Sequence, residues 1–336
     1  MPPEPIDPFF ALFIGSLASA SLATWFALGR RRPILAYEPR RPVPWSFVAP
    51  VVILLIVLMP VWSFVTGNEP RPVDEFAGPL EMSNQILSVA AIQVLVFGTL
   101  LTLVIVFSSA TQRDMGLPEF AHEFGRDIKI GAVTWLAALL PVYTIQSLLA
   151  TTVSEESSHP LIKMVQREPN GPLLFVAFIS AVIVAPICEE CGFRLLLQGW
   201  LEKFEDSRLG WRMRRLHESP HDLPPESADE STGAPPDGAS AATELTDDEQ
   251  FAQPPRRGLG VLPHGWIPIL ASSLLFALAH LGYGPDPVAL FVLAVMLGYV
   301  YQRTHRIIPC IVTHMLFNFT TLAILAFAAA RGAMPE

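Results

Sequence analysis

The chain has 336 residues, of which 51% are hydrophobic and only 16% are charged. Soluble domains carry about 25% charged residues, so this composition excludes an ordinary soluble domain and predicts a protein that crosses a membrane several times. The formal net charge is −9, but residues 218–257 hold ten acidic residues against two arginines, and the remainder is close to neutral. No basic stripe with interleaved aromatic residues occurs, which excludes nucleic acid as a partner.

Eight apolar stretches are candidates for membrane-spanning helices. A bilayer core is about 30 Å thick and needs about 20 apolar residues per helix. The stretches are Phe9–Leu28, Trp45–Val65, Ile86–Ser108, Ile130–Leu149, Leu173–Leu197, Trp266–Leu281, Val288–Tyr301 and Ile307–Ala330. The seventh is short for a full crossing, and Gly282–Pro287 predicts a turn before it, inside the bundle. The predicted fold class is all-α: a polytopic membrane protein of about eight transmembrane helices, with a conical bundle core formed by the last four.

Arg and Lys are distributed unevenly over the loops. The loops after the first, third, fifth and seventh stretches carry clusters of Arg and Lys, whereas Thr66–Gln85 and Thr151–Pro172 carry few. Because positively charged loops stay in the cytoplasm, we predict a multi-pass protein of the plasma (inner) membrane with both termini outside. The first stretch is not expected to be a cleavable signal peptide, since Met1–Pro8 contains no Lys or Arg.

Composition divides the chain into three parts. Residues 1–150 form an N-terminal transmembrane region of four predicted helices. Residues 173–217 and 258–330 form the core that carries the polar motifs described next. Residues 218–257 are rich in Pro, Ser, Ala, Gly and acidic residues, a composition that predicts a disordered acidic linker on the cytoplasmic side.

The fifth stretch contains two adjacent glutamates, Glu189 and Glu190, and an arginine, Arg194. An ionisable side chain within a membrane is costly and is a functional-site hypothesis by default. Glu190 and Arg194 are four residues apart and share one helix face, which favours an ion pair. Glu189 points about 100° away and remains available for another partner. The alternative is a carboxylate cluster that only marks the cytoplasmic end of the helix.

Two later stretches each carry a histidine four residues from a second residue of interest, a spacing that places both on one helix face. Phe276 and His280 share a face of the sixth stretch, and His280 alone would be explained as a core histidine bonded to a carbonyl. His314 and Asn318 share a face of the eighth stretch. Side-by-side donors of this kind suit an oxyanion hole, and they also suit hydrogen bonds between helices.

The three motifs together resemble those of a known family. Glu-Glu-x-x-x-Arg, Phe-x-x-x-His and His-x-x-x-Asn, in this order on successive apolar stretches, are similar to the motifs of the CPBP family of intramembrane proteases. This family is also called Abi or CAAX-protease-like and includes the prenyl-protein endopeptidases. The resemblance covers residues 173–325 and implies an endopeptidase within the bilayer, acting on a membrane-associated protein or peptide.

The resemblance also implies a role for each motif residue. Glu189, with His280, would activate a water molecule as general base in a cavity that opens toward the cytoplasm. His314 and Asn318 would stabilise the oxyanion. Glu190 and its arginine partner would orient the helix. This mechanism requires no cofactor, but Glu189, His280 and His314 would also serve as three ligands of a catalytic zinc, and the sequence leaves both possibilities open.

Two other functions are compatible with a membrane protein of this composition. A non-catalytic scaffold, or an immunity or regulatory protein that retains the fold, would be indicated by the loss of a motif residue, and none is lost. A proton-coupled transporter would be indicated by interrupted helices in two matching halves, which the sequence does not show.

The proposed pairing of Glu189 with His280 raises a question of depth. In straight helices Glu189 lies ~24 Å from the outer start of its helix and His280 lies ~21 Å from the inner start of its own, so the two differ in depth by ~15 Å. A tilt, a kink at Pro186, or a sixth helix that begins below the membrane plane is expected to close this gap.

Overall fold

The computed structural model describes residues 7–31, 34–38, 42–67, 78–150, 171–205, 207–208, 265–281 and 286–330. The elements in these ranges are the helices α1 (Pro8–Gly29), α2 (Val48–Thr66), α3 (Pro79–Ser108), α4 (Ala121–Ala150), α6 (Gly171–Ala177), η2 (Phe178–Val184), α7 (Ala185–Glu190), η3 (Cys191–Gln198), α10 (Trp266–Leu278), α11 (Asp286–Thr304) and α12 (Ile307–Ala330). The predicted all-α class is confirmed for the described part of the chain. The predicted linker, 218–257, lies outside it.

Seven of the described helices are long and apolar enough to cross a membrane, which confirms a polytopic membrane protein. The helix that is too short is α10, which has 13 residues and is about 20 Å long. The expectation that the seventh stretch would be short is wrong, because α11 has 19 residues. Asp286 and Pro287 belong to the first turn of α11, where a proline is tolerated because its missing N–H would have no helical partner.

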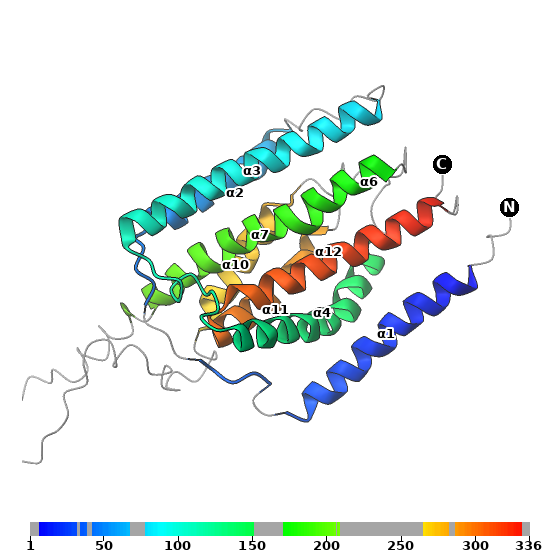
Figure 1. The fold of residues 1–336 in the computed structure, drawn as a ribbon, viewed down its shortest axis with the longest axis horizontal. Coiled ribbons are helices and arrows are strands. Elements are labelled where there is room, and N and C mark those ends of the chain that lie inside the picture. Colours follow the sequence, from blue (N-terminus) through cyan, green and yellow to red (C-terminus); the bar gives the residue numbers. More distant parts are fainter. Residues whose placement is uncertain are drawn as a thin grey trace, which may run out of the picture.

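The helices run in roughly one direction, with α2 and α3, which overlap in this view, on one side of the bundle and α1 on the opposite side (Figure 1). The helix formed by α6, η2, α7 and η3 lies between α3 and α12, and α4 packs against α1, α11 and α12. The start of α1 and the end of α12 lie at the same end of the bundle (Figure 1). We call the opposite end, where the described helix ends at Glu205 and α10 begins, the linker end.

The buried core lies where η3, α10, α11 and α12 meet. Its members include Leu195, Phe276, Leu293, Leu297 and Cys310, each at most 1% exposed. By contrast, α1, α2 and α3 expose many large apolar side chains along their length. Helices that face lipid acyl chains are expected to have such a surface, because apolar side chains are compatible with lipid and the backbone polar groups are satisfied within the helix.

Pro141 interrupts the hydrogen bonds of α4, and α1 supplies a replacement. A proline has no N–H, so the carbonyl of Ala137, four residues earlier, loses its helical donor. The indole Nε1 of Trp25 donates to that carbonyl oxygen at 2.8 Å. One turn away in α1, the hydroxyl oxygen of the fully buried Ser21 accepts from the backbone N–H of Leu140 at 3.2 Å. Two hydrogen bonds therefore join α1 to α4 at the turn that Pro141 interrupts.

α4 lies very close to α12 at Gly131. A β-carbon added there would lie 2.7 Å from Cβ of Val312 and 2.8 Å from the carbonyl oxygen of Pro309. The hydroxyl of Thr313 donates to the Gly131 carbonyl oxygen at 2.9 Å. Because His314 follows directly in α12, this contact determines how far that histidine lies from α4.

Candidate functional site

The helix that carries the two glutamates is irregular around them. The short α7 lies between two π-helical segments, η2 and η3, and π-helical turns occur frequently at functional sites. Pro186, the residue at which the sequence predicts a kink, lies in the first turn of α7. The backbone N–H of Ala185 bonds the carbonyl oxygen of Ser180, five residues earlier, as a π-helix requires.

Asn318 compensates for the missing N–H of Pro186. In the π-helical register the donor for the carbonyl of Ala181 would be residue 186, five positions later, and a proline cannot donate. The side-chain Nδ2 of Asn318 donates to this carbonyl oxygen instead, at 2.8 Å. One N–H of the amide thus joins α12 to η2, and its second N–H is available for the predicted oxyanion role.

Glu190 and Arg194 form the ion pair that their spacing predicts. Oε2 of Glu190 lies 3.2 Å from Nε of Arg194, and both side chains are completely buried. A buried carboxylate is stable only when paired or hydrogen-bonded. The arginine therefore allows Glu190 to stay charged in an apolar surrounding, and a charged Glu190 can act on a further neighbour.

That neighbour is His314, which lies between the two glutamates. Nδ1 of His314 is 2.9 Å from Oε1 of Glu190, and since a carboxylate only accepts, the ring donates from Nδ1. Its other nitrogen, Nε2, lies 3.8 Å from Oε2 of Glu189. The side chains of His314 and Glu190 are 4% and 0% exposed, whereas that of Glu189 is 17% exposed. Glu189 is thus the carboxylate that a substrate can reach.

The ring of Phe276, fully buried in α10, connects the remaining motif residues. Its centroid lies 4.9 Å from that of His280 and 5.8 Å from that of His314. The guanidinium carbon of Arg194 lies 5.2 Å from the same centroid, and the ring of Phe193 meets it edge-on at 5.1 Å. Phe276 therefore brings side chains from three helices to one place.

In the described part of the chain, the hydrogen bond of His280 is to its own helix rather than to Glu189. His280 follows the end of α10, and its Nδ1 is 2.9 Å from the carbonyl oxygen of Phe276, so the ring donates from Nδ1 and keeps Nε2 as an acceptor. Among the residues that the structure describes, no hydrogen bond or ion pair joins His280 to either glutamate. Its predicted role as partner of Glu189 stays a prediction.

A zinc site would require the side chains of Glu189, His280 and His314 to converge on one point. No group of three or more His, Cys, Asp or Glu side chains within the described ranges is placed to hold a metal ion. Of the three predicted ligands, Glu189 and His314 are neighbours, while Nδ1 of His280 is bound to a carbonyl one turn away. The set does not fit a zinc ion as it stands, and no chemical step is assigned to one.

The start of α12, seven residues before His314, is fixed to α4 by an ion-pair cluster. Nε of Arg306 donates to both carboxylate oxygens of Asp127 at 2.8 Å, and its Nη2 lies 3.2 Å from Oε2 of Glu123. Partial burial disfavours the charged guanidinium, but the two carboxylates outweigh it and hold the pKa of Arg306 above its ordinary value. This cluster and the Gly131 contact together determine where α12 lies against α4.

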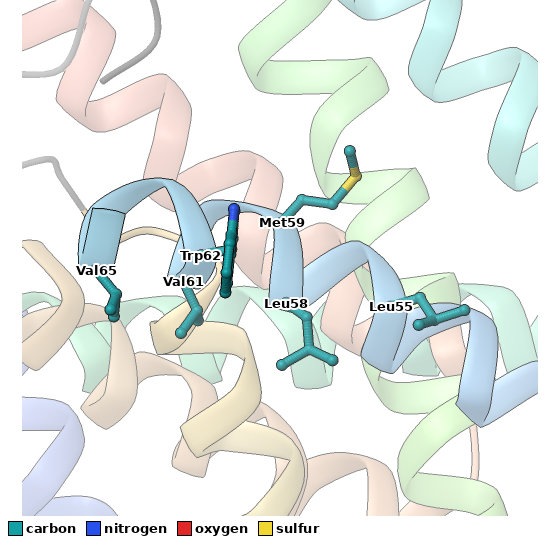
Figure 2. A pocket seen from close by; sticks show the side chains of 6 residues that line it. All are labelled: Leu55, Leu58, Met59, Val61, Trp62 and Val65. Carbon is teal, nitrogen blue, oxygen red and sulfur yellow. The ribbon is translucent and has the colours of Figure 1, made fainter. Parts of the chain in front are cut away.

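A surface hollow of about 470 Å³ lies away from the motif residues and belongs to α2 alone. It is lined by Leu55, Leu58, Met59, Val61, Trp62 and Val65 (Figure 2). Because this lining contains no titratable side chain and most of its members are exposed, it matches a lipid-facing surface rather than a catalytic cavity.

The fold and the site define an all-helical, polytopic membrane protein with a buried Arg–Glu–His–Glu row. A family model described as Type II CAAX prenyl endopeptidase Rce1-like matches residues 254–320, a range that includes His280, His314 and Asn318. No curated protein and no solved structure matches the chain. This match supports the CPBP, or CAAX-protease-like, resemblance that the motifs predicted, over the part of the chain that the family model covers.

Proposed function

We propose that this protein is an intramembrane endopeptidase that hydrolyses a peptide bond of a membrane-associated protein or peptide. The observation that carries the proposal is the row in which Arg194 pairs with Glu190, Glu190 accepts from His314, and His314 faces Glu189. A prenylated C-terminus is the substrate class that the description of the matching family suggests.

Glu189 is assigned as the general base. It is the more exposed of the two glutamates, and its Oε2 lies 3.8 Å from Nε2 of His314. Glu190 is completely buried, with one oxygen on His314 and the other beside Arg194, so it cannot reach a substrate. A carboxylate that accepts a proton from a bound water molecule makes that water a better nucleophile.

The hydrolysis then proceeds in two steps. The water oxygen bonds to the carbonyl carbon of the substrate while Glu189 takes one of its protons, and an oxyanion develops on the carbonyl oxygen. The C–N bond then breaks, and the proton on Glu189 passes to the leaving nitrogen, so that a carboxylic acid and an amine are formed. Donors directed at the oxyanion stabilise this path, and removing one such donor reduces the rate about 100-fold to 1,000-fold.

His314 and Asn318 are assigned as these donors. His314 donates from Nδ1 to Glu190, so its Nε2 also carries an N–H only when the ring is protonated. The protonated ring is the form assigned to this role, because the ring lies between two carboxylates and presents Nε2 next to Glu189, where the reacting carbonyl has to lie. Asn318 retains one amide N–H after its bond to Ala181. His280 is assigned as a second base through its Nε2, an assignment that its motif supports.

The test is the substitution Glu189→Gln, with Glu81→Gln as the control. Both changes remove one carboxylate and keep the side-chain size, and Glu81 is an exposed residue of the first turn of α3. We would compare the termini of membrane proteins and peptides in cells that produce each variant at matched levels. New termini should appear with the unsubstituted protein and with Glu81→Gln, and disappear with Glu189→Gln.

A terminal profile that is the same for all three proteins would contradict the proposal. If a cellular phenotype of the protein also survived Glu189→Gln, the non-catalytic scaffold would become the better explanation.

A further inference from the structure

Four polar side chains occupy every fourth position of the helix that carries the glutamates. They are Glu190, Arg194, Gln198 and Glu202, and we call them the polar ladder. Their exposed fractions are 0%, 0%, 0% and 8%. Residues four apart share one side of a helix, so the ladder forms a buried polar line from the site toward the linker end. Gln198 and Glu202 belong to none of the three motifs, although their spacing is visible in the sequence.

Side chains from other elements extend the ladder at the linker end. Nε2 of Gln198 donates to Oε1 of Glu202 at 3.0 Å and to the carbonyl oxygen of Gly298 at 2.9 Å. The hydroxyl of Ser272 in α10 donates to Oε1 of Gln198 at 3.3 Å. Oε2 of Glu202 lies 3.5 Å from Nε2 of His305, in the turn between α11 and α12. A connected polar chain therefore reaches from the linker end to Gln198.

Arg194, one turn above Gln198, has donors for which the described residues supply no hydrogen-bond partner. Its Nη1 and Nη2 are completely buried and make no hydrogen bond to any described residue, and the same is true of the hydroxyl of Ser273 next to Ser272. Its contact with Glu190 is an ion pair through Nε. Buried donors of this kind are as a rule satisfied, and water is the smallest partner able to do so.

We propose that the polar ladder is a water path that leads from the linker end to Glu189 and supplies the water consumed in hydrolysis. The role of the path in hydrolysis rests on the proposed function, whereas the path itself is inferred from the buried contacts. Each peptide bond cleaved consumes one water molecule, and the bilayer interior supplies none. Gln198 is the central member, because it alone bonds both to the ladder and to α10 and α11.

Hydroxyl-radical footprinting of the full-length protein in lipid nanodiscs tests the path without requiring proteolysis. Radicals generated from water oxidise side chains that bound water touches, and mass spectrometry locates the products. We would compare Gln198→Met with the unsubstituted protein and with Gln93→Met. Methionine keeps the length of glutamine and removes both polar atoms, and Gln93 undergoes the same change on α3.

The unsubstituted protein and Gln93→Met should be oxidised at Phe276, which is buried next to Arg194. In Gln198→Met we expect this oxidation to fall about fivefold to tenfold, the factor that corresponds to the loss of one buried hydrogen bond. Peptide turnover should fall by a similar factor with KM unchanged, because water supply rather than substrate binding is affected.

Unchanged oxidation of Phe276 in Gln198→Met, or its absence in the unsubstituted protein, would overturn the path. Reduced oxidation in a protein that cleaves no peptide would support the path and contradict the proposed function. If Gln198→Met fails to fold, as judged by its unfolding temperature, Ser272→Ala removes one donor to Gln198 and is measured with the same outcomes.

Discussion

Replacing Gly131 by alanine tests whether α4 sets the position of His314. The new β-carbon would lie 2.7 Å from Cβ of Val312 and 2.8 Å from the carbonyl oxygen of Pro309. Neither atom is the mobile end of a side chain, so α12 itself has to move. Carbon atoms pack at about 3.5–4.0 Å, which requires a displacement of about 1 Å.

This displacement should reduce both stability and activity. Overpacking a close helix contact costs about 1–3 kcal/mol of folding free energy. The hydroxyl of Thr313 donates to the Gly131 carbonyl, and His314 is the next residue in α12. A shift of α12 at this point would therefore break or distort the 2.9 Å hydrogen bond between His314 and Glu190. A misplacement of about 1 Å at a catalytic group reduces turnover by about 100-fold.

The matched control is Gly125→Ala, in the same helix, where an added β-carbon meets no atom within 4 Å. Both variants would be purified in the same lipid nanodiscs, and their unfolding temperatures and peptide turnover would be compared. If Gly131→Ala keeps the stability and turnover of the control, then α4 does not position His314 and the packing argument is wrong.

Two further predictions concern the carbonyls that prolines leave without a donor. Trp25→Phe removes the indole donor to the Ala137 carbonyl and should lower the unfolding free energy by about 1 kcal/mol. The control Trp62→Phe, on the exposed face of α2, should lower it much less. Equal losses in the two variants would contradict a specific hydrogen bond. Asn318→Leu should destabilise by about 1–3 kcal/mol, because it leaves the Ala181 carbonyl unpaired. Adding Pro186→Ala to Asn318→Leu restores a backbone donor for this carbonyl, so the double variant should recover stability but not turnover. If stability is not recovered, the hydrogen bond from Asn318 to the Ala181 carbonyl is not what stabilises the contact.

The sequence determined the features that depend on composition and on short spacing. The membrane class follows from apolar stretches long enough for a bilayer, because an unpaired backbone group in lipid is costly wherever it lies. The Glu190–Arg194 pair follows from a spacing of four residues, which local helix geometry alone brings together. The family resemblance, which a family model supports over residues 254–320, followed from three motifs whose order along the chain is visible without a fold.

Contacts between distant segments were decided only by the tertiary structure. His314 lies 124 residues after Glu190, and nothing in their spacing showed that its ring would stand between the two glutamates. The depth of a residue depends on where its helix begins, so the short α10 and the hydrogen bond of His280 to the Phe276 carbonyl became visible only in the folded bundle. The bond of Asn318 to a carbonyl freed by Pro186 likewise depends on a π-helical register, which packing selects and composition does not reveal.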